Sequence, residues 1–462
     1  MAMKSVLERA ARRFAPDRRG NFGMMMALFV PMLVLGAGFG VNIAQVSNAR
    51  SNLLAALDSA VTSTARDLTT GKVTGEAAIR SSVEAFLFAN GTRSFSKADL
   101  LTLDTIDVNT TDRTVTAEAS VVVNVAFPLF GVTNQQKITT RSAAIYSDRR
   151  IEVAMMLDLT GSMKKDAFSD KLGDLQSAAK NAVAALLNYN KGANPRVRIA
   201  LVPYANAVNV GKSIAEKAVY VERKSADRKQ APSSTDPKAV GGSRPDYCAT
   251  ERKGTYQYTD HGPTASMVNR DFLLTEFAGG MGIYGSSVAC PAAKLVPLTA
   301  DKATLDATID SFVADGGTAG HIGIQWAWYM LSEKWANVVG ASAAPEKVDP
   351  KSVGKYAILM TDGEFNLSYS DVSKAADAYI PAGKKATRDA ATDLCKAMRK
   401  AGIEIFTIGF KLTDQKAKDT MKDCASPDTG AIQHYFDTST GKELDGAFQK
   451  IVENLERLAL TR

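Results

Sequence analysis

Side chains that carry oxygen are concentrated at three points of the sequence. Asp158, Thr160 and Ser162 stand two residues apart in the segment DLTGS, so one turn can direct all three at the same point. Thr318 follows two glycines that allow a close backbone approach, and Asp362 stands in the segment TDG. Carboxylates and hydroxyls without His or Cys suit a hard cation such as Mg²⁺ or Mn²⁺.

A cation held in this way keeps part of its charge. One or two bound carboxylates leave it net positive, so the acidic side chain of a partner can complete its coordination. Each segment also has a simpler interpretation: Asp158 as a helix cap, residues 316–318 as a plain helix start, and TDG as a turn. The joint arrangement of the three segments favours a metal site over these separate roles.

The elements around these residues predict an α/β domain over residues 149–462. Short apolar runs alternate with segments whose apolar residues recur at three- and four-residue steps, as in buried strands and amphipathic helices. Strands are expected at 153–157, 197–202, 356–360 and 403–408, and helices at 172–186, 303–313, 322–331, 386–400 and 444–458. This order predicts a doubly wound, mostly parallel sheet. Ligands bind beyond the carboxyl ends of such strands, which is where Asp158 and Asp362 stand.

Residues 206–299 interrupt the alternation and predict a large insertion rich in Gly, Ser, Pro and Tyr. Cys248 and Cys290 lie within it, whereas Cys395 and Cys424 follow it. Four cysteines allow three pairings. Proximity in the sequence favours Cys248–Cys290 and Cys395–Cys424, and four free buried thiols are the alternative.

The N-terminal region predicts one transmembrane helix at residues 21–45, after a basic tail at 1–20. Phe22 to Val41 has no charged residue, and 20 helical residues rise about 30 Å, the thickness of a hydrocarbon core. Six basic residues precede this run, so the tail is expected in the cytoplasm and the bulk of the chain outside. The alternatives are a buried core helix and a cleaved signal peptide, whose apolar region is usually shorter.

Residues 46–148 predict a stalk and a small α+β module. Asn42 to about Thr70 reads as an amphipathic continuation of the membrane helix, and Glu76 to Phe88 as a second helix. Segments rich in Thr, Val and Ile predict strands at 101–108, 114–126 and 137–146.

The three oxygen-rich segments resemble the metal-ion-dependent adhesion site of von Willebrand factor A domains. That family has DxSxS, a distant Thr and a TDG after a strand; here DLTGS, GGT and TDG follow in the same order between about Ile151 and Leu458. Thr160 stands where Ser is more usual and keeps the hydroxyl. The resemblance implies a binding domain rather than an enzyme, with a protein ligand that offers an acidic side chain. The implied metal ligands are Asp158, Thr160, Ser162, Thr318 and Asp362.

The front of the chain, with RRGNFGMMMALF before a single span, resembles the TadE/TadG-like proteins of the tight-adherence (Flp) pilus system. The segments GGTAGHIGIQWAWYMLS and TDGEFN resemble the TadG-like subgroup, which adds a von Willebrand A-like domain. This implies a pilus-assembly scaffold or adhesin in the bacterial inner membrane, with other assembly components as partners. Pilin-like relatives usually carry Glu shortly after the processing Gly; Gly20 is followed by Asn21 and no Glu, which favours a permanent anchor.

Other functions have weaker support. Asp158 as the nucleophile of a metal-dependent phosphohydrolase is one alternative, and a chelatase-type A domain that works with an ATPase is another, although the chain has no GxxxxGK[ST]. Nucleic-acid binding is not expected, because part of the net charge of +7 comes from the tail. We expect a packing role for His321 and consider Glu364 as an outer ligand.

Overall fold

The computed structural model divides the chain into two compact units, Met1–Ser147 and Asp148–Arg462. The described residues are 19–69, 72–91, 94–95, 100–125, 127, 134–147, 149–188, 190, 195–223, 246–274, 290–349, 352–370, 381–430 and 432–461. Most of the predicted cytoplasmic tail, residues 1–18, lies outside them. Each unit has its own sheet and its own apolar core.

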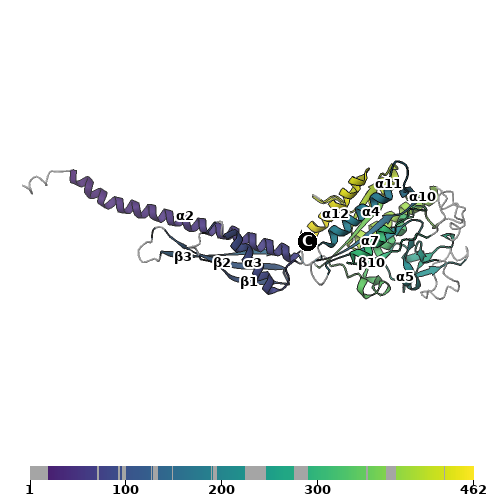
Figure 1. The fold of residues 1–462 in the computed structure, drawn as a ribbon, viewed down its shortest axis with the longest axis horizontal. Helices are drawn as coiled ribbons and strands as arrows, with labels where there is room; N and C mark the ends of the chain where they lie inside the picture. The colour runs from purple at the N-terminus through teal and green to yellow at the C-terminus, as the bar shows by residue number, and fades with distance from the viewer. Residues whose placement is uncertain are drawn as a thin grey trace, which may run out of the picture. The chain divides into compact units, whose positions relative to one another are not determined.

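The first unit begins with one long helix, α2 (Arg19–Thr69), which contains the predicted membrane span. Among the described helices it is the one long and apolar enough to cross a membrane. Large apolar side chains along its N-terminal half are exposed, Met32 and Leu33 to 70% each. This half extends past the sheet of the same unit (Figure 1). An apolar surface of this extent is stable in lipid rather than in water.

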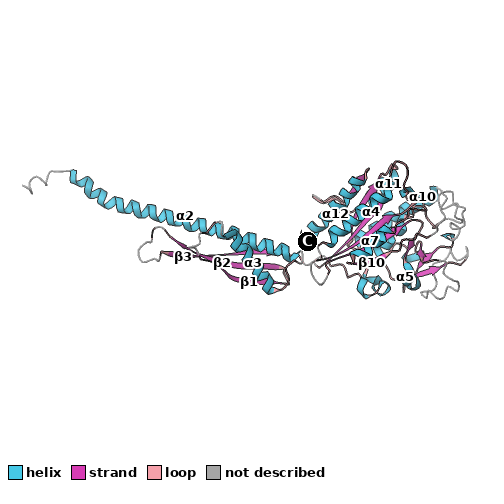
Figure 2. Cartoon of the chain, in the orientation of Figure 1, coloured by secondary structure: helices cyan, strands magenta, loops and turns pink. Residues whose placement is uncertain are grey.

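The C-terminal half of α2 packs on a small α+β module (Figure 2). Leu53, Leu57 and Val61 recur at four-residue steps, and all three are fully buried in the core of this module. The module consists of α3 (Glu76–Gly91) and an antiparallel sheet of β1 (Leu100–Asn109), β2 (Thr114–Asn124) and β3 (Gln135–Ile145), in that order.

The second unit is built on a six-stranded sheet. All neighbouring strands are parallel except the edge pair β10 and β5. The strands, in spatial order, are β10 (Val296–Thr299), β5 (Val197–Tyr204), β4 (Arg150–Asp158), β11 (Val353–Thr361), β12 (Glu404–Phe410) and β13 (Tyr435–Thr438). The prediction of a chain that mixes α and β structure behind a long apolar helix is confirmed.

Helices cover both faces of this sheet (Figure 1). Along β4, Val153 and Met155 point to one core cluster, whereas Ala154 and Met156 point to the other. The first cluster contains residues of α4 (Lys171–Leu187), α7 (Lys302–Asp310) and α12 (Gly441–Thr461). The second contains residues of α8 (Gly320–Tyr329), α10 (Pro381–Lys400) and α11 (Gln415–Cys424). Burial on both faces explains why the strands read as continuous apolar runs.

The stretch 206–299 contains more regular structure than the sequence predicted. It forms one antiparallel pair, β6 with β8, and one parallel pair, β7 with β9. Its described elements are β6 (Val208–Asn209), α5 (Gly211–Ala218), β7 (Val219–Val221), β8 (Cys248–Ala249), the short 3-10 helix η4 (Gly254–Tyr256) and β9 (Val268–Arg270), followed by β10 of the main sheet. Its apolar residues, such as Ile214 and Val268, belong to the same core cluster as α8.

Both favoured disulfide bonds are present. Cys248 is bonded to Cys290, and Cys395 of α10 is bonded to Cys424 of α11. The structure describes no free cysteine. The first bond closes part of the stretch 206–299, and the second joins two helices on one face of the sheet.

Replacing both Cys395 and Cys424 by Ala should lower the free energy of unfolding by about 2–4 kcal/mol, because the bond closes a loop with a sequence separation of 29 residues. Urea unfolding followed by the emission of the buried Trp326 and Trp335 would measure this. An unchanged midpoint and slope would contradict an intact bond between α10 and α11.

Candidate metal site at the carboxyl edge of the sheet

The carboxyl ends of β4 and β11 bring Asp158 and Asp362 together. The two strands are parallel neighbours, with Met156 opposite Leu359, so both chains leave the sheet at the same edge. The backbone N–H of Asp362 donates to Oδ2 of Asp158 at 3.4 Å. Both residues are buried. Two predicted ligands that lie 204 residues apart in the sequence therefore lie side by side.

Neutral donors surround the carboxylate of Asp158. The backbone N–H of Thr160 donates to Oδ1 at 2.8 Å. The hydroxyls of Tyr204 and Thr361 donate to Oδ2 at 2.8 and 2.7 Å. Burial and the charge of Asp158 raise the pKa of Tyr204 well above its usual value, so its hydroxyl remains a donor. Together with the longer bond from Asp362 N, four hydrogen bonds from neutral groups therefore hold this carboxylate in place.

Hydroxyl groups connect the first loop to Asp362. Thr160 Oγ1 lies 2.9 Å from Ser162 Oγ, and Ser162 Oγ donates to Asp362 Oδ1 at 2.5 Å. Lys171 Nζ donates to the other oxygen, Asp362 Oδ2, at 2.7 Å. Four of the five predicted ligands, Asp158 included, thus belong to one hydrogen-bonded cluster.

The electrostatics of the cluster favour a cation. Burial and the nearby charge of Asp158 raise the pKa of Asp362 to about 6, and the bonds from Lys171 and Ser162 oppose this rise. Lys171 forms an ion pair with Asp362, whereas the described residues provide no ion pair for the adjacent carboxylate of Asp158. A divalent cation would relieve the mutual repulsion of the two carboxylates more effectively than one ammonium group.

The loop of Thr318 is tied to both other loops through backbone groups. Gly316 has a φ of 87°, and its carbonyl accepts a bond from Gly161 N at 2.8 Å. A Cβ at Gly316 would lie 2.9 Å from the Asn206 side chain, so the position requires glycine. Thr318 N donates to Asn366 Oδ1 at 2.8 Å, and Asn366 N donates to Thr318 O at 3.0 Å. The Thr318 hydroxyl has no hydrogen-bond partner among the described residues.

The donor chemistry fits a hard divalent cation. The side chains of Asp158, Thr160, Ser162 and Asp362 offer only oxygen, and the contacts that link the last three span 2.5–2.9 Å. Thr318 adds a nearly buried hydroxyl from the neighbouring loop. Mg²⁺ and Mn²⁺ prefer ligands of this kind.

Three residues of the site were missed by sequence reasoning: Lys171, Tyr204 and Thr361. Tyr204 and Thr361 are the last residues of β5 and β11. Because ligands bind beyond the carboxyl ends of parallel strands, both could have been predicted in the same way as Asp158. Lys171 begins α4, and no sequence pattern distinguishes it from other surface lysines. Glu364, considered as an outer ligand, forms ion pairs with two basic residues of α10 at 2.8 and 2.6 Å.

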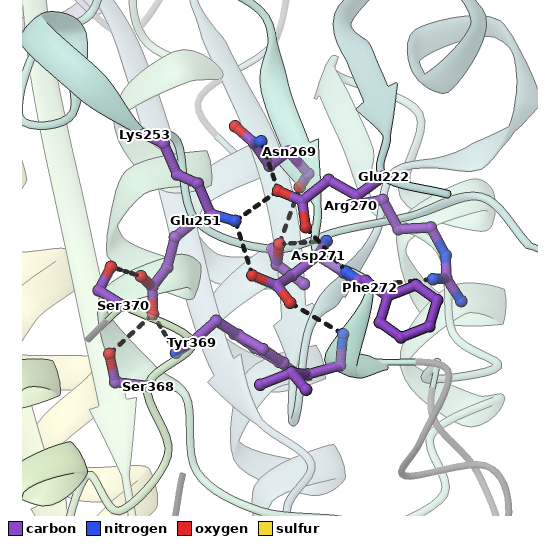
Figure 3. A network of polar contacts seen from close by, with 12 residues as sticks. Glu222, Glu251, Lys253, Asn269, Arg270, Asp271, Phe272, Ser368, Tyr369 and Ser370 are labelled. Atoms are coloured by element: carbon purple, nitrogen blue, oxygen red, sulfur yellow. Dashed lines mark hydrogen bonds and ion pairs between the residues drawn. The ribbon is translucent and has the colours of Figure 1, made fainter. Parts of the chain in front are cut away.

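Glu251, from the stretch 206–299, contacts the loop after the TDG segment (Figure 3). It also contacts His321 of α8. Its carboxylate accepts bonds from Ser368 Oγ at 2.9 Å, Tyr369 N at 2.7 Å and Ser370 Oγ. His321 Nε2 lies 2.7 Å from the same carboxylate. His321 is buried at the start of α8, and its other ring nitrogen, Nδ1, lies 2.6 Å from Thr387 Oγ1.

These contacts determine the charge state of Glu251. Burial raises the pKa of Glu251, but His321 and the hydroxyl and amide donors outweigh burial and lower the pKa to about 2. The buried carboxylate therefore remains charged at neutral pH and holds the loop.

A second polar network stabilises the same stretch (Figure 3). Lys253 Nζ lies between two buried carboxylates, Glu222 and Asp271, and is 2.8 Å from Asp271 Oδ2. Asn269 Nδ2 and Phe272 N donate to Glu222 at 2.8 and 2.9 Å. Burial and the charge of Asp271 raise the pKa of Glu222. Ion pairs and hydrogen bonds thus connect β7 and β9 to the segment around Lys253.

Comparison with known proteins identifies the N-terminal segment. Residues 20–67 match the family described as "Putative Flp pilus-assembly TadE/G-like". The predicted resemblance to TadE/TadG-like proteins is confirmed over these residues. The sequence matches no curated protein.

Several solved pilus proteins are similar to the chain. The pilus adhesin SpaC from Lactobacillus rhamnosus GG is 12% identical with a TM-score of 0.35, over 78% of this chain and 35% of SpaC. The vWF domain of the type V pili tip protein Mfa5 from Porphyromonas gingivalis is 16% identical with a TM-score of 0.37, over 68% of this chain and 97% of that domain. The chain therefore spans about a third of SpaC.

Replacing Glu251 by Gln should reduce the free energy of unfolding at pH 7 by about 1–3 kcal/mol, because hydrogen bonds to a charged acceptor are lost. The folded-state pKa of about 2 is below the usual 4.5, so the charge of Glu251 stabilises the fold above pH 4.5. This stabilisation falls as the pH falls towards 2, and the gap between wild type and variant should close.

Urea unfolding at several pH values would measure the gap. Glu216→Gln, at an exposed position on α5, is the matched control and should change the unfolding free energy by less than about 0.5 kcal/mol. A gap that is the same at pH 7 and pH 2.5 would contradict a stabilising charge on Glu251.

Proposed function

We propose that this chain is a membrane-anchored adhesion or scaffolding protein of Flp pilus assembly, which binds a protein partner through a divalent cation. The single observation that carries the proposal is the cluster at the carboxyl edge of the sheet. There, Ser162 and Asp362, 200 residues apart in the sequence, share a hydrogen bond beside Asp158. The TadE/G-like match over residues 20–67 supports the pilus assignment.

The second unit is proposed to be a von Willebrand A-type domain with a doubly wound sheet. The order DLTGS, GGT and TDG supports this class, and so do a largely parallel sheet and helices on both of its faces. The three segments lie in loops tied together by the Gly161–Gly316 and Thr318–Asn366 hydrogen bonds.

Asp158, Thr160, Ser162, Thr318 and Asp362 would hold the Mg²⁺ or Mn²⁺ ion, some of them through water. When bound, the ion supplies residual positive charge that attracts a carboxylate of the partner. The protein orients the ligands: Tyr204 and Thr361 fix Asp158, and Ser162 fixes one oxygen of Asp362. Lys171 holds the other oxygen of Asp362, so its ammonium group would compete with the ion.

The phosphohydrolase alternative has less support from this geometry. A nucleophilic carboxylate needs an oxygen that a substrate can approach. Asp158 is fully buried, and both of its oxygens accept hydrogen bonds from the protein. Hydrolysis of a phosphoester by the wild type, and its loss in Asp158→Ala, would favour the enzyme over the binding protein.

The proposed location is the bacterial inner membrane, with one span, a cytoplasmic N-terminus and both folded units outside. The basic residues before α2 support this orientation. The disulfide bonds support an oxidising compartment for the second unit. Other pilus-assembly components, or a protein ligand with an exposed acidic side chain, are the proposed partners.

When fused after Thr70, a reporter that works only outside the cytoplasm should be active, and one that works only in the cytoplasm should be inactive. The reason is that the positive-inside rule places the basic tail in the cytoplasm. Alkaline phosphatase and green fluorescent protein fusions at this point would measure the orientation. Fluorescence without phosphatase activity would overturn the proposed topology.

Calorimetric titration of the detergent-solubilised chain with Mg²⁺ and Mn²⁺ should give one site in the millimolar range or tighter. Asp158→Ala should abolish binding, because it removes a charged ligand and the acceptor for four donors. Thr160→Ser, the matched control, should bind almost normally because the hydroxyl remains. Lys171→Met should bind more tightly, because the competing ammonium group is gone. Identical binding by the wild type and Asp158→Ala, or binding by neither, would refute the metal site.

A further inference from the structure

One aromatic ring, that of Phe127, packs against the exposed apolar surface of α2 at Gly38, and this packing position is called the seat below. Gly38 and Asn42 lie one helical turn apart, and both contact Phe127. A Cβ added at Gly38 would lie 3.0 Å from Cγ of the Phe127 ring, whereas one at Gly36 or Gly40 would meet nothing within 4 Å. The glycine at position 38 thus makes room for a residue from the connection between β2 and β3.

The Asn42 side chain forms hydrogen bonds with both backbone groups of Phe127. Asn42 Oδ1 accepts a bond from Phe127 N at 3.1 Å, and Asn42 Nδ2 donates to Phe127 O. A backbone N–H or C=O without a partner is strongly unfavourable in an apolar environment. A polar side chain that covers both groups of one residue is therefore suited to a non-helical segment at the level of lipid.

The surroundings of the seat are apolar. Phe39, Val41 and Ile43 of α2 are 43–52% exposed, and Phe127 itself is 46% exposed. The sequence from Val125 to Asn134 contains no charged residue, and Val125 N donates to Asn134 O at 2.9 Å at the base of the connection. The exposed side chains of α2 beside Phe127 continue the exposed apolar surface of the predicted span.

We infer that Phe127 is a second membrane contact, inserted into the lipid interface beside α2. Gly38 lies three residues before Val41, the last residue before the polar Asn42, and is therefore about 4.5 Å inside the end of the apolar run at 1.5 Å per residue. The ring therefore lies at the rim of the apolar layer, where aromatic side chains are favoured. This contact would fix the β2–β3 end of the sheet at the membrane surface.

The inference rests on the proposed anchoring of α2, and the test separates the two. Trp is introduced into the full chain as Phe127→Trp, Leu33→Trp or Thr111→Trp. Each variant is reconstituted in phosphatidylcholine–phosphatidylglycerol vesicles whose acyl chains carry bromine near the headgroup or near the bilayer centre. The three native Trp residues are at most 4% exposed, and the wild type supplies their background emission.

The added Trp at position 127 should lose emission mainly with bromine near the headgroup, and its spectrum should be blue-shifted. Leu33→Trp, within the apolar run, should lose emission mainly with bromine near the centre. Thr111→Trp, in the turn between β1 and β2 at the opposite end of the sheet, should lose none. If Leu33→Trp is not quenched, the proposed anchor fails; if it is quenched and Phe127→Trp is not, only the present inference fails.

A pair of glycine variants tests the seat itself in the Phe127→Trp background. Gly38→Leu should displace the ring and change the quenching at position 127, whereas Gly40→Leu should leave it unchanged. Equal quenching in both variants would overturn the role of Gly38. Loss of lipid quenching together with cross-linking between copies would show that a second chain, not lipid, covers Phe127, which would also overturn the inference.

Discussion

The burial of two carboxylates at one edge of the sheet is the constraint on which the second unit depends. Ionised side chains lose several kcal/mol of solvation when they are buried, and two adjacent ones also repel each other. Several neighbouring elements supply donors: hydroxyls at the ends of β5 and β11 bind Asp158, and Ser162 and Lys171 bind Asp362. Hydrogen bonds and one ion pair therefore offset the burial of the two acids, and the proposed cation would add to this compensation.

These donors work only if three loops keep their positions, and a second layer of polar contacts holds them. Asn206 and Asn366 join the loop of Thr318 to its neighbours, and Glu251 holds the chain after Asp362. Glu251 lies in the stretch that interrupts the α/β alternation. Buried ion pairs around Lys253 stabilise that stretch internally. Through Glu251 it also helps to position a loop of the candidate site.

The features that follow local rules could be predicted from the sequence. Apolar runs predicted the strands β4, β5, β11 and β12. The ends of the strands indicated Asp158 and Asp362 as candidate ligands, and proximity in the sequence predicted both disulfide bonds. The short edge strands β10 and β13, of four residues each, are too brief for a periodic pattern. Lys171 and Glu251 were missed for a different reason: their partners lie 191 and 118 residues away, so only the tertiary fold brings them together.

The length of α2 determines how far the end of the first unit lies from the apolar run. The helix continues without a break from the apolar run to Thr69, and Thr69 Oγ1 accepts a bond from Ser147 N at 2.9 Å. The first unit therefore ends beside the C-terminus of its own long helix. From Val41 to Thr69 the helix rises about 42 Å at 1.5 Å per residue. A helix packed on a sheet along this length is stiffer than a loop, so the first unit fixes the distance between the apolar run and its own last residue, Ser147.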